Sequence, residues 1–243
     1  MLYYDYTYFL FLLILLPFMA LSMWASAKVN STYAKFDRVA NASHMTGYDT
    51  AVRLLNRNGI SDISVNRVAG RLSDHYHPTR RQVNLSQSTY GSASVAAVAV
   101  AAHEIGHVMQ KKSGYVPYKI RAALVPAANV GSRLALPLIL IGIIIEVAFA
   151  SSPTYIGQYF MYAGIAFYSL STLFMLVTLP VEFDASRRAK KMLLSEGILT
   201  ESELPGAKKV LSAAAMTYVA SMLISLVYFL RYLLIVLSYT RRR

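Results

Sequence analysis

Residues 156–179 read IGQYFMYAGIAFYSLSTLFMLVTL and contain no charged side chain. A helix needs about 20 apolar residues to cross the hydrocarbon core of a bilayer. Inside lipid every backbone amide needs an internal partner, so such a segment must be helical. This stretch therefore predicts a transmembrane helix and places the chain among membrane proteins.

Three further apolar stretches have a similar length. They lie at residues 6–26, 134–150 and 210–230, the last with an extension to residue 237. The loop at residues 151–155 is short and uncharged, so the second and third spans should form a hairpin. The composition agrees, with 56% apolar residues, 15% charged residues and a mean hydropathy of +0.42. We expect about four transmembrane helices.

The first apolar stretch has two interpretations. Ala25, Ser26 and Ala27 resemble the small-residue cleavage site of a secretory signal. No Lys or Arg precedes the stretch, however, whereas Lys28 and Lys35 follow it. This asymmetry favours a retained anchor whose N-terminus lies outside the cell.

The segment between the first two spans is polar enough to fold outside the lipid. Its apolar pattern predicts helices at residues 49–58 and 92–112, and strands at residues 63–68 and 82–85 joined by a loop or hairpin. Pro180 suits the first turn of a separate helix at residues 181–196. The expected parts are an anchor (1–27), a membrane-proximal portion (28–132), a hairpin (133–179), a further helix (180–209) and a C-terminal transmembrane or membrane-associated helix (210–243).

Charge gives the orientation. The chain has 24 Lys and Arg against 12 Asp and Glu, and the positive residues cluster in segments that flank the spans. Positive flanks are retained in the cytoplasm, so the membrane-proximal portion should face the cytoplasm. Residues 241–243 are all Arg and conflict with four full crossings, so either the last segment does not cross fully or the rule fails there. No nucleic-acid-binding motif accompanies the charge, and we expect no nucleic acid partner.

Residues 103–107 read HEIGH within an Ala-rich helical segment. Four residues advance about 400° around a helix, so the imidazoles of His103 and His107 leave the same face and can bind one zinc ion. Glu104 then stands beside the ion as a general base, and Gly106 removes side-chain bulk beside it. The alternative is a pair of core histidines with a surface glutamate. It is disfavoured because a buried unpaired Glu104 would be costly.

A catalytic zinc takes a third protein ligand. The chain has no Cys, so the candidates are His or carboxylate residues: His44, His75, His77, Glu182 and Asp184. A hairpin of spans two and three returns the chain to the side of the His pair, which makes Glu182 reachable. His75 is also a candidate for contact with substrate or for stabilising the transition state, and the alternative for it and for His77 is a solvent-exposed loop histidine.

HEIGH, the earlier SDHY at residues 73–76 and the later PVEFDAS at residues 180–186 together resemble the YugP-like family of membrane neutral zinc metallopeptidases. The chain is more distantly similar to the HtpX-like and CAAX-processing membrane peptidases. That resemblance implies Glu182 as the third zinc ligand. Asp184 stays an alternative, because a carboxylate of either length suits zinc. In those relatives an aspartate four residues after the ligand glutamate orients a metal-binding histidine. Here that position is Ser186, so the orienting residue is unassigned.

The expected fold is an α-helical integral membrane protein with a small membrane-proximal α+β zincin-like catalytic portion. The expected function is zinc-dependent hydrolysis of peptide bonds in membrane or membrane-proximal proteins, by a metal-activated water with Glu104 as general base. The expected partners are the lipid bilayer and a protein or peptide substrate, and the sequence predicts no oligomeric state. A membrane scaffold or assembly factor with a structural or vestigial metal site is the alternative. Transport is weaker, because the His pair lies outside the predicted spans.

Overall fold

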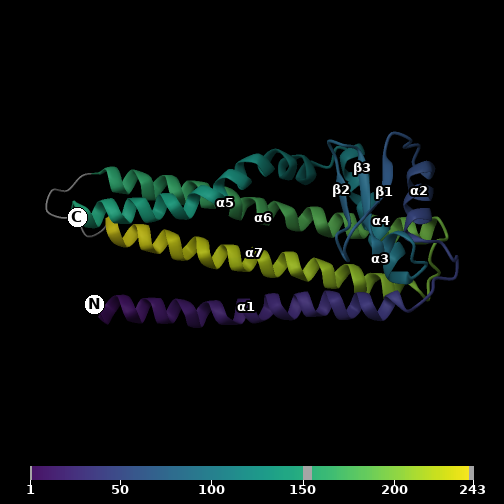
Figure 1. The fold of residues 1–243 in the computed structure, drawn as a ribbon, viewed down its shortest axis with the longest axis horizontal. Helices are drawn as coiled ribbons and strands as arrows, with labels where there is room; N and C mark the ends of the chain where they lie inside the picture. Colours follow the sequence, from purple (N-terminus) through teal and green to yellow (C-terminus); the bar gives the residue numbers. More distant parts are fainter. Residues whose placement is uncertain (1, 150–154, 241–243) are drawn as a thin grey trace. The chain divides into compact units, whose positions relative to one another are not determined.

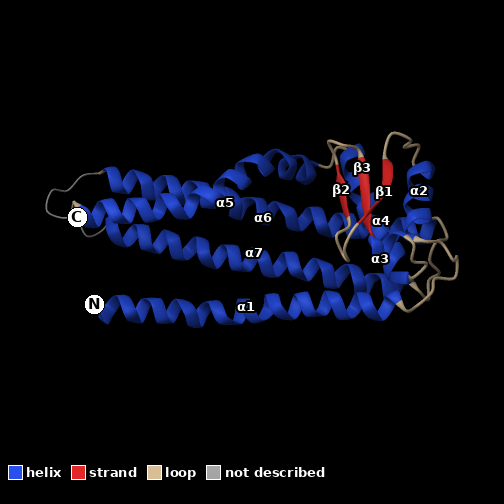
Figure 2. Ribbon diagram, viewed as in Figure 1, coloured by secondary structure: helices blue, strands red, loops and turns tan. Residues whose placement is uncertain are grey.

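A computed structural model describes residues 2–149 and 155–240 (Figure 1). Its helices are α1 (Leu2–Asp37), α2 (Gly47–Arg57), α3 (Gln87–Tyr90), α4 (Val95–Lys112), α5 (Val116–Ala148), α6 (Ile156–Ser195) and α7 (Leu204–Thr240). Its strands are β1 (Ser64–Val68), β2 (His75–His77) and β3 (Gln82–Ser86). Figure 2 shows that helices dominate and that the strands gather in one small sheet.

Four helices in the described part of the chain are long and apolar enough to cross a membrane, namely α1, α5, α6 and α7. This confirms the predicted class of membrane protein with a small α+β portion. The chain divides into two compact units. The first contains Met1–Met23, Ile120–Thr178 and Tyr218–Arg243, and the second contains Trp24–Lys119 and Leu179–Thr217.

Within the first unit, α5 and α6 pack through glycines. A Cβ on Gly142 would lie 2.5 Å from the carbonyl oxygen of Gly157, and a Cβ on Gly164 would lie 2.8 Å from that of Ala135. Small residues let helix backbones approach closely in a membrane, where no hydrophobic effect drives helices together. The predicted second and third spans thus share a close-packed interface, while most of the loop predicted to join them lies outside the described residues.

The second unit contains the sheet, whose strand order is β1-β3-β2. β1 pairs parallel to β3, and β2 pairs antiparallel to β3. The predicted strands are confirmed, and the predicted loop or hairpin contributes β2. Apolar side chains of α2, α4, β3 and the end of α6 form the core; among them are Leu54, Leu85, Ile105 and Leu193.

Capping residues explain where α2 and α4 begin. The Thr46 side chain accepts a hydrogen bond from the backbone N–H of Asp49, and Asp49 caps Thr46 in return. At α4 the Ser94 hydroxyl accepts from the backbone N–H of Ala97. Both helices agree with the sequence prediction within a few residues.

The prediction of a separate helix after Pro180 was wrong, because α6 runs without interruption from Ile156 to Ser195. An internal proline removes one helical hydrogen bond and crowds the preceding turn. Val181, Ala185 and Leu193 are nevertheless fully buried beyond it. We infer that this packing offsets the cost of the proline and allows α6 to continue to Ser195.

Candidate metal centre

The HEIGH segment lies in the middle of α4, where Glu104 and His107 are buried and His103 is half-buried. Gly106 lies against the backbone of α6. A Cβ at this position would lie 2.6 Å from the backbone carbonyl oxygen of Ala185. The glycine therefore makes room for the α6 backbone, which carries Glu182, and not simply for an ion as we expected from the sequence.

Three side chains converge between α4 and α6. The ligand atoms offered by His103, His107 and Glu182 all lie within 4.8 Å of one another. Nε2 of His103 lies 3.2 Å from Oε2 of Glu182, and Nε2 of His107 lies 3.7 Å from the same oxygen. The two imidazole rings stand nearly perpendicular, with an interplanar angle of 84°. The structure thus brings together the three residues that we expected to bind metal.

The donor set fits a zinc ion. Two imidazole nitrogens and one carboxylate oxygen are the ligands of many catalytic zinc sites, which leave a fourth position to water. Glu182 is only 2% exposed. A carboxylate buried to this degree needs a positive or hydrogen-bonding partner, and both Nε2 atoms already face it. A cation held by these three atoms would satisfy that need.

The electrostatics differ between the two glutamates. Burial raises the pKa of Glu104, and the nearby imidazoles of His103 and His107 only partly oppose that effect. Burial also acts on Glu182, but its interactions with His103 and His107 outweigh burial and hold the pKa of this carboxyl well below its usual range. Glu182 is therefore the ionised member, whereas Glu104 is a carboxylate that gains protons more readily.

The Nδ1 atoms of His103 and His107, which face away from Glu182, each have a hydrogen-bonding partner. Nδ1 of His107 lies 3.0 Å from Oε1 of Gln110, and Nδ1 of His103 lies 3.2 Å from Oγ of Ser186. Sequence reasoning missed both contacts. Gln110 follows His107 by three residues on the same helix face, a spacing that could have suggested the pair. Ser186 stands at the position for which the sequence left the orienting residue unassigned.

Other histidines proposed from the sequence lie elsewhere. His75 is exposed on β2, with Nδ1 2.8 Å from the carbonyl oxygen of Ser73 and Nε2 3.0 Å from the side-chain nitrogen of Asn84. Nδ1 of His77 accepts from the backbone N–H of Arg80. Neither belongs to the three-residue cluster in the described part of the chain. A substrate contact for His75 stays a prediction.

His44 and Asp184 complete the list of candidate ligands. His44 lies in a loop with a φ of 53°. Asp184 is held by Nε of Arg188 at 2.6 Å and by Nε2 of Gln110 at 3.0 Å. Burial tends to raise the pKa of Asp184, but these hydrogen bonds outweigh it and lower the pKa. Its carboxylate is thus committed to a network beside the cluster.

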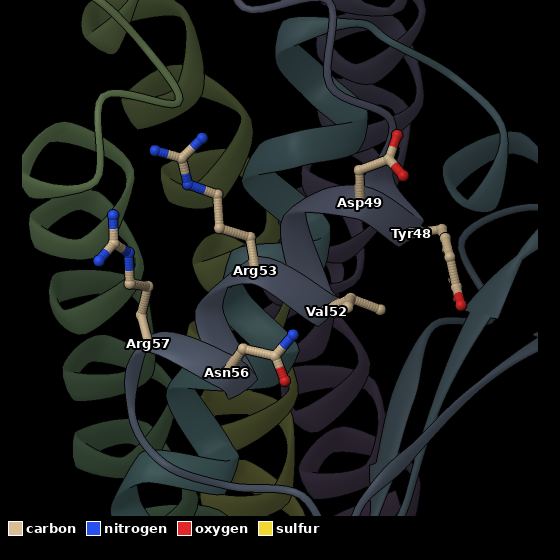
Figure 3. A pocket seen from close by; sticks show the side chains of 6 residues that line it. All are labelled: Tyr48, Asp49, Val52, Arg53, Asn56 and Arg57. Carbon is tan, nitrogen blue, oxygen red and sulfur yellow. The ribbon is translucent and has the colours of Figure 1, made fainter.

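A separate surface hollow of about 420 Å³ lies along α2 (Figure 3). Its lining residues are Tyr48, Asp49, Val52, Arg53, Asn56 and Arg57. Arg53 donates to the carbonyl oxygen of Glu196 at 2.7 Å, and Arg57 lies 3.2 Å from the carboxylate of Glu196. These contacts attach α2 to the end of α6, and the hollow shares no residue with the His and Glu cluster.

A family model described as "Putative neutral zinc metallopeptidase" matches residues 11–237 of the chain. The chain belongs to this neutral zinc metallopeptidase family. A protein of Bacillus subtilis (strain 168) named "Putative membrane protease YugP" is 42% identical over 229 residues, which cover 94% of this chain and 97% of that protein. No solved structure matches the chain.

Membership in the neutral zinc metallopeptidase family confirms the family that HEIGH and PVEFDAS indicated. The match includes the HEIGH helix, Glu182, the whole of α5 and α6, and most of α1 and α7. The similarity to the Bacillus protein likewise runs through nearly the whole chain. The chain thus combines membership in this zinc metallopeptidase family with four helices, in its described part, that are long and apolar enough to cross a membrane.

Proposed function

We propose that this chain is a membrane-embedded zinc endopeptidase in which His103, His107 and Glu182 hold the metal. The convergence of these three side chains from α4 and α6 carries the proposal. A structural zinc would take four protein ligands, whereas the described residues offer a group of three. That difference supports a catalytic site over a scaffold with structural zinc.

The ligand residues have defined tasks. His103 and His107 each present Nε2 toward the carboxylate of Glu182, which supplies negative charge at the same point. A zinc ion bound there would supply Lewis acidity toward a water molecule and a peptide carbonyl.

Glu104 is the general base of the proposed reaction. It takes a proton from the attacking water and passes that proton to the nitrogen of the leaving amine. Burial raises the pKa of its carboxyl. A base with a raised pKa binds the proton more readily and still releases it to an amine, so the environment of Glu104 suits both steps.

The place of Glu182 on α6 supports a substrate in or near the membrane. Glu182 follows the charge-free stretch at residues 156–179 by only three residues on one continuous helix. At a rise of about 1.5 Å per residue, this is about 5 Å along the helix axis. A peptide bond cleaved here belongs to a membrane protein or to a segment held at the membrane surface.

The proposed site faces the cytoplasm. Lys28 and Lys35 follow the first apolar stretch, and Lys111 and Lys112 end the HEIGH helix. Positively charged residues beside membrane spans are retained on the cytoplasmic side.

The test compares wild-type protein with Glu104→Gln, both purified as full chains in detergent. Glutamine keeps the shape of the side chain but cannot take up the proton. We expect Glu104→Gln to retain zinc and to lose at least about 10²-fold in the rate of casein or membrane-peptide cleavage, the usual contribution of a general base. Cleavage by the variant at the wild-type rate would show that Glu104 is not the base.

A further inference from the structure

Gln110 is a fully buried polar side chain on α4 that contacts both halves of the proposed metal site. Its Nε2 donates to the backbone carbonyl of Val181 at 2.7 Å and to Oδ2 of Asp184 at 3.0 Å. Its Oε1 lies 3.0 Å from Nδ1 of His107. The amide therefore joins α6, next to Glu182, to one of the two imidazoles.

The orientation of this amide is determined by its acceptors. Val181 offers a carbonyl oxygen and Asp184 offers a carboxylate oxygen, and neither can donate a hydrogen bond. A flipped amide would turn Oε1 toward these two oxygens and lose both bonds in a buried setting, which is costly. Oε1 must therefore face His107.

The tautomer of His107 follows from that orientation. An amide oxygen only accepts, so Nδ1 of His107 must carry a proton, and in the neutral imidazole that binds a metal Nε2 then presents its lone pair. Nε2 is the atom that faces Glu182, at 3.7 Å. Arg188 holds Asp184 in place with a 2.6 Å hydrogen bond. A connected series of hydrogen bonds thus runs from Arg188 through Asp184 and Gln110 to His107.

The partner of His103 is different in kind. Ser186 offers a hydroxyl 3.2 Å from Nδ1 of His103. A hydroxyl donates or accepts as required, so it orients the ring without selecting a tautomer. The two histidines are therefore supported unequally.

We propose that Gln110 is a positioning residue of the metal site, which holds His107 in the Nδ1–H tautomer and aims its Nε2 at the ion. Asp184 and the carbonyl of Val181 hold Gln110 in the orientation that this requires. The inference rests on the proposed binding of zinc by His103, His107 and Glu182. It gives His107 an orienting partner on α4, whereas the hydroxyl of Ser186 is the partner of His103.

Zinc affinity tests the inference without relying on peptidase activity. Each full-length variant is purified in detergent, and its zinc affinity is measured by competition with a chromophoric chelator. Loss of a hydrogen-bonding partner behind a metal ligand weakens metal binding by about 10- to 100-fold. We expect Gln110→Met to fall in that range and Ser186→Ala to have a smaller effect.

Gln158→Met is the matched control. Gln158 is also buried, and it lies on α6 at 24 positions before Glu182. This variant should bind zinc as the wild type does. The visible absorption spectrum of the Co²⁺-loaded protein gives a second readout, because a reoriented imidazole changes the ligand field. We expect the spectrum to change in Gln110→Met and to stay as in the wild type in Gln158→Met.

A double-mutant cycle separates positioning from general stability. Asp184→Asn preserves side-chain shape and weakens the restraint on Gln110, so it should lower zinc affinity in the wild type and have no further effect beside Gln110→Met. The thermal midpoint of the metal-free protein is measured for each variant. If Gln110→Met does not fold, Asp184→Asn tests the role of Gln110 instead. Its zinc affinity should then be lower than that of Gln158→Met, and an equal affinity would contradict the role.

Wild-type zinc affinity in Gln110→Met, or full additivity with Asp184→Asn, would overturn the inference. A wild-type protein that binds no zinc would refute both the proposed function and this role of Gln110. A protein that binds zinc but cleaves no peptide would contradict the proposed function alone, and the affinities would still decide the role of Gln110.

Discussion

Gly106 shows how one missing side chain determines the distance between two helices. A Cβ here would lie 2.6 Å from the carbonyl oxygen of Ala185, and that oxygen belongs to backbone. Backbone cannot rotate away as a long side chain can. The helices must separate to accept even a methyl group, and Glu182 would move away from the His pair.

Two effects of opposite sign meet in Gly106→Ala. Alanine favours a helix interior by about 1 kcal/mol over glycine, whereas overpacking costs about 1–3 kcal/mol. Because the clash is with backbone, we expect overpacking to dominate. The variant should show a lower thermal midpoint and weaker zinc binding.

Gly91→Ala provides the control for Gly106→Ala. A Cβ on Gly91 would meet no atom within 4 Å, and its φ of −101° suits any residue. This variant should match the wild type in both measurements. Unchanged zinc affinity in Gly106→Ala would show that close approach of α4 and α6 is not required for metal binding.

The chemistry of HEIGH could be predicted at the residue level because the helical repeat alone places His103 and His107 on one face. The contacts that orient Gln110 behind His107 could not be predicted. Gln110 is oriented by Val181 and Asp184, which lie 71 and 74 residues away in the sequence. Their relation depends on how α4 packs on α6, and no local pattern encodes it.

At the level of elements, the start of α7 depends on one carboxylate. Oε2 of Glu203 accepts from the backbone N–H and the hydroxyl of Thr200, and Oε1 accepts from the backbone N–H of Ala42. Partial burial raises the pKa of Glu203, but these hydrogen bonds outweigh it and lower the pKa. The lowered pKa means that the ionised form stabilises the fold.

The lowered pKa of Glu203 predicts how the stability of the fold changes with pH. A carboxyl whose pKa is lower in the folded state contributes stability above its unfolded pKa of about 4.3, and that stability is lost as the pH falls through the folded value. Glu203→Gln should lower the thermal midpoint at neutral pH, because an amide cannot accept at both ends. It should also reduce the fall of the midpoint in acid.

Glu201→Gln, at an exposed position in the same turn, is the control for Glu203→Gln. Its thermal midpoint should follow the wild type across the pH range. If Glu203→Gln shows the same pH dependence as the wild type, the cap at the start of α7 is not responsible for acid sensitivity.

Element boundaries were predicted less well than element types. The four apolar stretches and the helix at residues 92–112 follow from composition and propensity, and the structure confirms them. The break at Pro180 was wrong because propensity rules count the lost hydrogen bond but not the burial of Val181, Ala185 and Leu193 beyond it. Tertiary packing decided the length of α6.

At the scale of the whole molecule, the absence of Cys allows a direct test of orientation. Single cysteines can be placed at Glu201 and Ile156, which are both exposed. A membrane-impermeant maleimide should label Ile156→Cys in intact cells. It should label Glu201→Cys only after permeabilisation, because the proposed site faces the cytoplasm.

The Cys-free parent chain is the control for background labelling. Labelling of Glu201→Cys in intact cells, with Ile156→Cys protected, would reverse the orientation. The proposed chemistry would remain, but the substrates would lie outside the cytoplasm.

Glu182, the proposed third ligand, could be predicted from the sequence only through long-range information. Glu182 lies 79 residues beyond His103. Only the hairpin of the second and third spans and the resemblance of PVEFDAS to a known family pointed to it. The structure brings its carboxylate to 3.2 Å from Nε2 of His103, and we expect this contact to require Gly106 and the continuity of α6.

X-ray absorption at the zinc edge, on purified wild type beside Glu182→Ala, tests most directly whether one zinc is held by two imidazoles and this carboxylate. We predict one zinc per wild-type chain with two imidazole nitrogens among its oxygen and nitrogen neighbours, and loss of most of the zinc in Glu182→Ala. Full zinc occupancy with unchanged coordination in Glu182→Ala, or no zinc in the wild type, would contradict the account.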